Sequence, residues 1–221
     1  MHVKDDAEEA SPDEDGAASR PRARTKAQQR EETVAALISA ARRLFAERGY
    51  AAVGTEEIVR QAGVTRGALY HHFRRGKEEL FRAVLVQVSA ETMRAVAGRA
   101  SQAGDPWQEL VTGIDAFLDV CTTPEVQQIM LIDGPSVLGW DVWRAIDADH
   151  GLGLLESAVQ AAMDDGKLLP GSSRAVAQVL LGALDEAAMV VARAEDPIAA
   201  RADMGQTLSH LLTGLRGPAS P

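Results

Sequence analysis

Apolar residues near the start of the chain recur at the three- and four-residue spacing of an amphipathic helix. The first such stripe consists of Val34, Leu37, Ile38, Ala41, Leu44 and Phe45. Gly49 is placed to end this helix as a left-handed cap, which would bring Tyr50 against Phe45. The pattern therefore predicts one long helix from about residue 31 to residue 49.

Two short helices are predicted next. Thr55 is the expected N-cap of the first, with two glutamates in the first turn, and Gly63 is expected to end it. Thr65 is the expected N-cap of the second, in which Leu69 and Phe73 lie four residues apart and face inward. Two short helices joined by a glycine-containing turn behind a longer helix are typical of a helix-turn-helix.

The rest of the chain is also predicted to be helical. A helix from Lys77 to about Gly98 is long enough to connect two domains, and five more are expected over residues 106–120, 125–132, 137–165, 172–193 and 197–215. Gly134-Pro135 is expected to break the chain as a hinge or pocket lip. No segment shows a sustained two-residue alternation. We therefore predict an all-α fold of about nine helices, with an N-terminal three-helix helix-turn-helix domain and a C-terminal helical bundle.

Residues 1–29 are polar, with an acidic part followed by a basic part and almost no large apolar side chains. Such a segment cannot offset its ordering entropy by burial, so we expect it to be disordered. The predicted domains are then residues 30–82, which include the start of the connecting helix (77–98), and residues 105–217.

The net charge of −9 is unevenly distributed. Residues 20–100 contain sixteen lysines and arginines against eight acids, whereas residues 101–221 contain six against seventeen. A basic middle block is the footprint expected of a small module that contacts phosphate. The basic residues before the first helix could form an arm that enters the minor groove, or a solvated tail that balances the acids before it. They are Arg20, Arg22, Arg24 and Lys26.

Several classes of function find little support in the sequence. Cys121 is the only cysteine, and neither a run of about 18 apolar residues nor a signal segment occurs. His71 and His72 diverge by about 100° on a helix and cannot share a metal ion. Ser136 lies in GPSVLG, whose second glycine is one position late for a nucleophile elbow. We therefore expect a cytoplasmic protein with no membrane segment, no metal or other cofactor and no catalytic activity.

A specific motif occupies residues 55–80, TEEIVRQAGVTRGALYHHFRRGKEEL, after a helix that ends in LFAERGY. It combines an Ala-Gly-Val-Thr turn, a Gly-Ala-Leu-Tyr start to the next helix, Phe73 and a lysine that opens the helix after it. Over about residues 33–82 the chain therefore resembles the DNA-binding domain of the TetR family of bacterial transcriptional repressors. That family usually has two residues between the phenylalanine and the lysine, whereas three separate Phe73 from Lys77. This leaves open whether Arg75 or Lys77 contacts phosphate.

The second short helix carries the residues best suited to contact DNA. Gly67 near its N-terminus allows a close approach, and Arg66 beside it can reach a guanine edge or a phosphate. One turn later, Tyr70 and His71 suit contacts to the backbone or the bases, although Tyr70 could instead pack against the first helix. Thr55 could offer its hydroxyl to a phosphate. The predicted DNA-binding residues are Thr55, Thr65, Arg66, Gly67, Tyr70, His71 and Lys77.

The C-terminal helices carry aromatic and sulfur-containing side chains of the kind that line small-molecule pockets, although core packing is the simpler explanation for any one of them. The candidate ligand-binding residues are Trp107, Phe117, Met130, Trp140, Trp143, His150 and Met163. Because basic residues are scarce in this part of the chain, it is poorly equipped to hold a strongly anionic ligand.

The last two predicted helices carry more apolar surface than the end of a monomer is expected to bury. In TetR-like proteins the corresponding helices form a four-helix bundle across a two-fold axis, and a palindromic operator requires such a closed dimer. The candidate interface residues are Val176, Leu180, Ala183, Leu184, Ala187, Leu208 and Leu212.

The resemblance implies a ligand-responsive homodimeric repressor that binds a palindrome in double-stranded DNA and is released by a small-molecule inducer. The alternative is a ligand-binding or adaptor protein whose helix-turn-helix no longer binds DNA. The basic block of residues 20–100 argues against that alternative.

Overall fold

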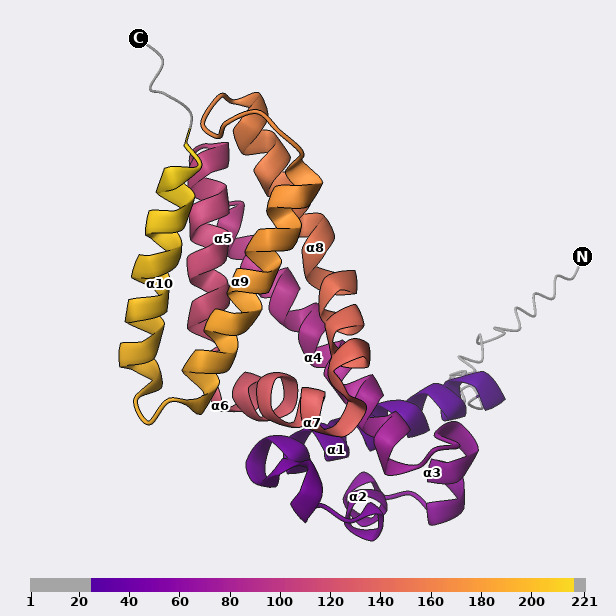
Figure 1. Cartoon of the computed structure of the whole chain (residues 1–221). Coiled ribbons are helices and arrows are strands. Elements are labelled where there is room, and N and C mark those ends of the chain that lie inside the picture. Colours follow the sequence, from indigo (N-terminus) through magenta and orange to yellow (C-terminus); the bar gives the residue numbers. More distant parts are fainter. Residues whose placement is uncertain (1–24, 217–221) are drawn as a thin grey trace, which may run out of the picture.

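The computed structural model describes residues 25–216, and the protein is helical over this range (Figure 1). The elements in chain order are α1 (Lys26–Ala52), α2 (Thr55–Ala62), α3 (Arg66–His72), α4 (Lys77–Ala100), α5 (Pro106–Val120), α6 (Pro124–Val126), the π-helix η1 (Gln127–Asp133), α7 (Gly134–Leu138), α8 (Trp140–Asp164), α9 (Ser173–Arg193) and α10 (Pro197–Gly214). The predicted all-α fold is confirmed, and the described range contains a single isolated β-bridge, between Leu168 and Arg216.

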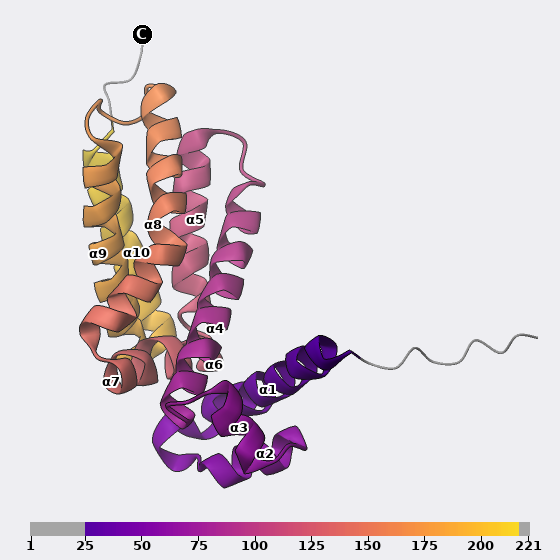
Figure 2. The same cartoon turned by 90° about the vertical axis from the view of Figure 1, so that its right-hand side faces the viewer.

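The helices form a small head and a longer body (Figures 1 and 2). The head consists of α1, α2, α3 and the first half of α4. The body consists of the second half of α4 and all later elements, with α6, η1 and α7 at the end that faces the head. Because α4 belongs to both parts, a displacement of this helix in the body also moves the head.

The core of the head is built from aromatic and aliphatic side chains of α1 to α4. Phe45, Tyr50 and Phe81 form a cluster in which the ring centroids lie 5.1 to 5.5 Å apart. Ile58 of α2 and Leu69 of α3 are fully buried against the same core. The predicted contact between Phe45 and Tyr50 is therefore present, and Ile58 and Leu69 hold the two short helices on this core.

Helix α1 begins earlier than the hydrophobic pattern predicts. Thr25 Oγ1 accepts a hydrogen bond from Gln28 N (3.2 Å), and Thr25 N donates to Gln28 Oε1 (2.9 Å). This capping box starts the helix at Lys26, so residues 26–29 are helical rather than disordered. The other basic residues of the predicted arm lie outside the described range.

Two further boundaries differ from the prediction. Gly54, not Thr55, is the N-cap of α2, and Thr55 is its first helical residue. Gly134-Pro135 does not break the chain, because the backbone stays helical from η1 into α7, and the Met130 carbonyl of the preceding turn accepts a hydrogen bond from Trp143 Nε1 (2.7 Å). The interruption lies instead at Gly139, which has φ +80° and separates α7 from α8.

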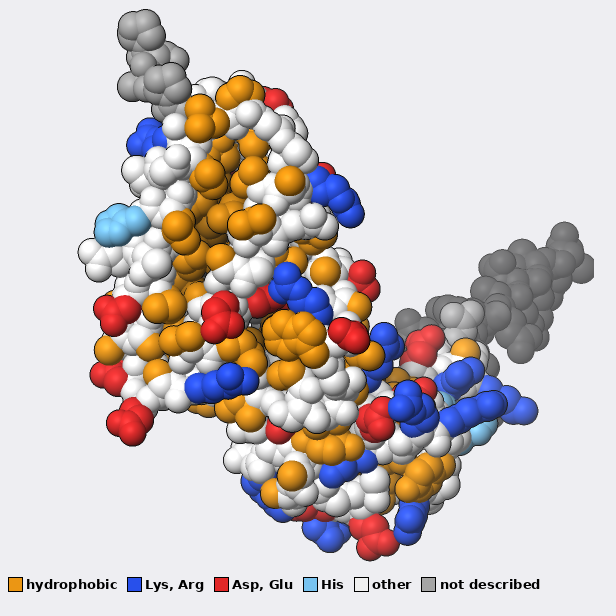
Figure 3. All heavy atoms as spheres, in the orientation of Figure 1, with side chains coloured by type: hydrophobic (Ala, Val, Ile, Leu, Met, Phe, Trp, Pro, Cys, Tyr) orange, Lys and Arg blue, Asp and Glu red, His pale blue; other side chains and the backbone are white. Residues whose placement is uncertain are grey.

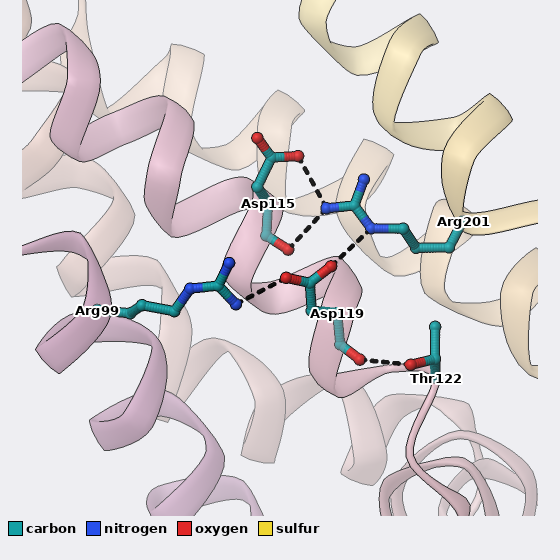
Figure 4. Close-up of polar contacts among 5 residues, drawn as sticks. All are labelled: Arg99, Asp115, Asp119, Thr122 and Arg201. Carbon is teal, nitrogen blue, oxygen red and sulfur yellow. Dashed lines mark hydrogen bonds and ion pairs between the residues drawn. The ribbon is translucent and has the colours of Figure 1, made fainter. Parts of the chain in front are cut away.

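An ion-pair network fastens the last helix to the body (Figure 4). Arg201 of α10 donates from Nε to Asp119 Oδ1 (2.8 Å) and from Nη2 to Asp115 Oδ1 (2.9 Å). Arg99 of α4 donates to the second oxygen of Asp119 (2.6 Å). Three helices are thus joined through one carboxylate, and α10 is held against α5.

Helix α9 is long and apolar enough, by length and composition, to cross a membrane. Half of the apolar window that meets this test is buried inside the body, as is common for a core helix of a helical domain.

Candidate DNA-binding surface and ligand cavity

The recognition helix α3 is fixed by one cap and one buried leucine. Thr65 Oγ1 accepts a hydrogen bond from Ala68 N (3.1 Å), as expected of an N-cap, and Leu69 is completely buried beneath the helix. Arg66, Gly67 and the other outward positions are consequently left on the surface of the head.

Arg66 lies at the N-terminus of α3 with 60% of its side chain exposed. It pairs with Glu56 at 3.3 Å, and that glutamate is itself 80% exposed. Exposed pairs of this kind contribute little to stability, so the guanidinium is readily available to another partner. A Cβ on Gly67 would have Thr65 Oγ1, at 3.8 Å, as its neighbour, which shows that this surface is open.

Tyr70 lies over the turn that follows α3. It is 41% exposed, and the Arg66 guanidinium lies 5.6 Å from its ring centroid. On its other side, a Cβ on Gly76 would come within 3.0 Å of ring atom Cε1. Gly76 also has φ +65°, so the additional residue between Phe73 and Lys77 is accommodated by a turn that requires glycine. His71 is exposed beside Tyr70.

Lys77 is turned into the head rather than toward solvent. Its Nζ donates to the carbonyl oxygens of Tyr50 and Val53, both at 2.9 Å, and lies 3.9 Å from the Tyr50 ring centroid. Burial lowers the pKa of this ammonium. Lys77 therefore satisfies the carbonyl groups at the end of α1. Arg75 is the more accessible of the two candidate phosphate contacts, with 73% of its side chain exposed and a pair to Glu78.

The remaining cations of the head add to this surface. Lysine and arginine side chains gather on the head in Figure 3. Thr55 is partly accessible at the start of α2, and further exposed arginines lie near α3 at positions Arg60 and Arg74.

The body contains a cavity of about 290 Å³ between α4, α5, α8 and α9, and the cavity is partly open to solvent. Its size is near the lower end of the range for small-molecule sites. Its wall is mostly apolar, and of the seven ligand-binding residues predicted from the sequence it contains Phe117.

The other six predicted ligand-binding residues lie elsewhere in the body. Trp107 is 4.9 Å from the Arg216 guanidinium, and Trp140 is exposed with its ring 4.9 Å from that of Trp143. His150 and Met163 lie on α8 outside the cavity wall, and Met130 is buried in η1. The size and chemical type of these side chains do not indicate which faces of the helices pack around the cavity.

Sequence reasoning missed Asp147, an acid in the cavity wall. Its side chain is buried on α8, and its Oδ2 has no hydrogen-bond partner among the described residues. A signal was available, because Asp147 lies four residues after Trp143 and four before Gly151, so it shares a helix face with residues that pack inward.

The cavity is linked to the head through the π-helix. Trp143, one turn before Asp147 on α8, donates from Nε1 to the Met130 carbonyl of η1 (2.7 Å). At the end of η1, Asp133 Oδ2 accepts a hydrogen bond from the Tyr50 amide of the head (2.7 Å). A short series of packed residues thus joins the helix that lines the cavity to the core of the head.

A second link between the two parts is ionic. Arg42 of α1 donates from Nε and Nη2 to the two carboxylate oxygens of Glu125 (2.7 and 2.8 Å) and also contacts Glu91 of α4. These hydrogen bonds raise the pKa of Arg42 against the effect of burial. A bidentate pair of this geometry fixes orientation as well as distance.

Most of the candidate interface residues face the interior of the protomer. Leu180, Leu184, Ala187, Leu208 and Leu212 are buried, whereas Val176 and Ala183 are partly accessible. The surface of α9 and α10 nevertheless remains apolar, and Figure 3 shows a long band of hydrophobic side chains on this side of the body. Val179 is 73% exposed and Leu211 is 55% exposed.

Comparison with known proteins agrees with the two-part architecture. Residues 37–84 match the family model of bacterial regulatory proteins of the tetR family, and residues 107–215 match that of the tetracyclin repressor-like C-terminal domain. A crystal structure of a TetR-family transcriptional regulator from Pectobacterium atrosepticum is 34% identical with a TM-score of 0.79, and the match covers 90% of this chain and 100% of that one.

Curated relatives match different shares of the chain. The transposon Tn10 TetC protein of Escherichia coli is 26% identical over 153 residues, which is 68% of this chain and 75% of TetC. The transcriptional activator FasR of Mycolicibacterium smegmatis is 37% identical over 90 residues, or 41% of each chain. The alignment with FasR thus spans less than half of that relative.

Proposed function

The chain belongs to the TetR family of bacterial regulatory proteins, and from this premise we propose that it is a homodimeric repressor that binds a palindromic operator and is released by a small-molecule inducer. The family consists of DNA-binding transcriptional regulators rather than enzymes. We place its action in the cytoplasm, where bacterial DNA is found.

The observation that carries DNA binding is the outward face of α3. Arg66 is exposed at the helix N-terminus, Gly67 beside it leaves open space, and Tyr70 and His71 follow one turn later. Arginine in the major groove reads guanine with two hydrogen bonds, and the small residue permits a close approach of the backbone. Thr55, Thr65 and Arg75 are placed to contact phosphates and so to position the helix.

Dimerisation is supported by an unpartnered apolar face on α9, formed by Val179, Ala183 and Val190. Val179 and Val190 are separated by three helical turns, and Val190 is 38% exposed. Exposed apolar surface of this extent marks an interaction site, and a two-fold contact would bring the same face of a second copy against it. The two recognition helices would then read the two halves of a palindrome.

Release by a ligand is supported by the cavity of the body and its link to the head. A molecule in the cavity contacts both α8 and α4. Helix α8 is joined to the Tyr50 amide of the head through Trp143 and η1, whereas α4 itself continues into the head. A ligand shifts the equilibrium between two conformations only by its difference in affinity for them, commonly by about 1–3 kcal/mol.

DNA binding is tested by fluorescence anisotropy with DNA from the region upstream of the gene, at several salt concentrations. We expect a steep loss of affinity with salt, and a loss of about 1–3 kcal/mol of specific binding in Arg66→Ala. The matched control is Arg174→Ala, an exposed arginine of α9 that also pairs with a glutamate. If neither specific nor salt-dependent binding occurs, the adaptor function replaces the repressor.

The dimer is tested by sedimentation. Val179→Glu should give a monomer, because the carboxylate would be desolvated twice in a two-fold contact while the protomer itself loses little packing. Ala35→Glu adds the same charge to an exposed position of α1 and should leave the assembly unchanged. A wild-type protein that is monomeric at micromolar concentration would contradict this part of the proposal.

A further inference from the structure

The cavity of the body contains a carboxylate without a matching cation. Asp147 is 9% exposed and lies in the cavity wall, and its Oδ2 has no hydrogen-bond partner in the described part of the chain. Arg144, one turn earlier on α8, forms an ion pair with Asp185 of α9, which is also buried. Two buried acids therefore share one arginine, and the acid without the direct pair is the one in the cavity wall.

The rest of the cavity wall does not compensate for this charge. Met93, Ile114, Phe117 and Leu155 are typical of its apolar lining, and the second acidic residue in the wall is Glu109. No lysine, arginine or histidine of residues 25–216 lines the cavity. His150 acts on Asp147 electrostatically from the same helix but stands outside the wall.

This composition favours one class of ligand. A buried ionised carboxylate is costly unless it is paired, and a hydrogen bond to a charged partner is stronger than one between neutral groups. An anionic ligand would place a second negative charge beside Asp147 and Glu109 in a medium of low dielectric constant. A neutral apolar ligand would fill the space but leave the carboxylate unpaired.

We infer that the cavity binds an apolar molecule with one basic nitrogen, whose ammonium group pairs with the Asp147 carboxylate while its hydrocarbon part packs against the apolar wall. The inference rests on the proposed function as a ligand-responsive regulator and names the class of ligand for that site. Burial also raises the pKa of the Asp147 carboxyl, against the effects of Arg144 and His150, which is the behaviour of an acid that lacks a close cation.

The test uses the full-length protein and three probes that share one hydrocarbon skeleton: phenylbutylamine, phenylbutanol and phenylbutyrate. Isothermal titration calorimetry should show that the amine binds about tenfold or more tightly than the alcohol, and that the carboxylate binds most weakly. Asp147→Asn keeps the shape of the side chain and should remove the preference for the amine. Asp149→Asn changes an exposed acid two residues away and should retain it.

A second variant tests the location independently of Asp147. Ala158 of α8 lines the cavity, and Ala158→Phe should fill it and weaken both the amine and the alcohol. If Asp147→Asn fails to fold, the ratio of amine to alcohol affinity in the wild-type protein and its loss in Ala158→Phe decide the question. The inference is overturned if the alcohol binds the wild-type protein as tightly as the amine. It is also overturned if the preference persists in a folded Asp147→Asn variant.

Operator binding is measured separately on the same samples, so the two proposals fail independently. A protein that binds its operator but shows no preference for the amine overturns the ligand class and leaves the regulator in place. A protein that prefers the amine through Asp147 but binds no DNA supports the ligand class and overturns the repressor.

Discussion

In the head, aromatic and aliphatic side chains from four helices meet in a core where Phe45, Ile58 and Leu69 have no exposed surface. The body, in contrast, leaves a cavity of about 290 Å³ between α4, α5, α8 and α9, with a carboxylate in its wall. A close-packed core moves as one unit and presents its surface residues in a fixed geometry. A domain with a cavity between its helices can adjust when the cavity is filled, so the two parts are suited to recognition and to response.

The largest effect is expected from a void made in the head. Phe81→Ala should lower the free energy of unfolding by about 3–5 kcal/mol, because Phe81 is fully buried and packs edge-on against Phe45 and Tyr50. Urea denaturation followed by circular dichroism measures the change. A loss below about 1 kcal/mol would show that the head tolerates voids as the body does, and the contrast between the two parts would disappear.

The connection between the two parts is tested at Asp133. Asp133→Ala removes the acceptor of the Tyr50 amide, and an unsatisfied, partly buried N–H group costs about 1–3 kcal/mol. We expect this loss in thermal and urea denaturation, together with a weaker effect of any cavity ligand on DNA binding. Asp141→Ala, at an exposed aspartate at the start of α8, is the matched control. If a cavity ligand affects DNA binding by Asp133→Ala as strongly as by the wild-type protein, the Arg42–Glu125 ion pair carries the connection instead.

A smaller, pH-dependent effect is expected from Asp147. Because burial raises the pKa of its carboxyl above the ordinary 3.8, the folded state holds this proton more tightly than the unfolded state. Stability should therefore fall as the pH rises from about 3.8 through the raised value, and the penalty should persist above it. Asp147→Asn should be the more stable protein near neutral pH, with no advantage in strong acid.

This difference is measured by denaturation of both proteins at a series of pH values, since a difference curve cancels titrations that the two share. The groups that act on Asp147 or lie near it are Arg144, His150, Cys121, Asp185 and Glu109. Asp149→Asn should give a flat difference curve. A wild-type protein that is more stable than Asp147→Asn at neutral pH would mean that the carboxylate is already paired in solution.

The smallest effect is expected where a side chain is enlarged inside the cavity. Ala158→Leu should change the free energy of unfolding by less than about 1 kcal/mol, because the added atoms enter existing space. Ala41→Leu in the packed head should cost about 1–3 kcal/mol, since Ala41 has no exposed surface. Equal losses at the two positions would mean that the cavity closes in solution.

The helix-turn-helix could be predicted from the sequence because its determinants are local. Thr65 caps α3 through a residue three positions away, and Gly63 ends α2 with φ +67°. Some of the differences are also local, such as the capping box of Thr25 and Gln28 that starts α1, but the path of the chain at Gly134 depends on a contact from elsewhere. Gly134 stays helical beside Trp143, whose ring atom Cδ1 would lie 2.7 Å from a Cβ at that position.

The DNA-binding surface could be predicted from the sequence better than the ligand cavity, because its geometry is set within one short helix. The outward position of Arg66 follows from the inward position of Leu69 on one short helix. The cavity is formed by faces of four helices, and their relative rotation is not encoded in any one of them. Lys77 illustrates the limit, because its place at the start of α4 suggests a phosphate contact, whereas the end of α1 binds its ammonium group.

The π-helix η1 at the junction of head and body has a mechanical consequence. Each residue of a π-helix turns through a smaller angle about the axis than a residue of an α-helix, and such segments are rare and often found at functional sites. If η1 tightened into α-helical geometry, Asp133 would rotate about the axis and leave the Tyr50 amide. The hydrogen bond that joins η1 to the head therefore depends on the helical geometry of one seven-residue segment.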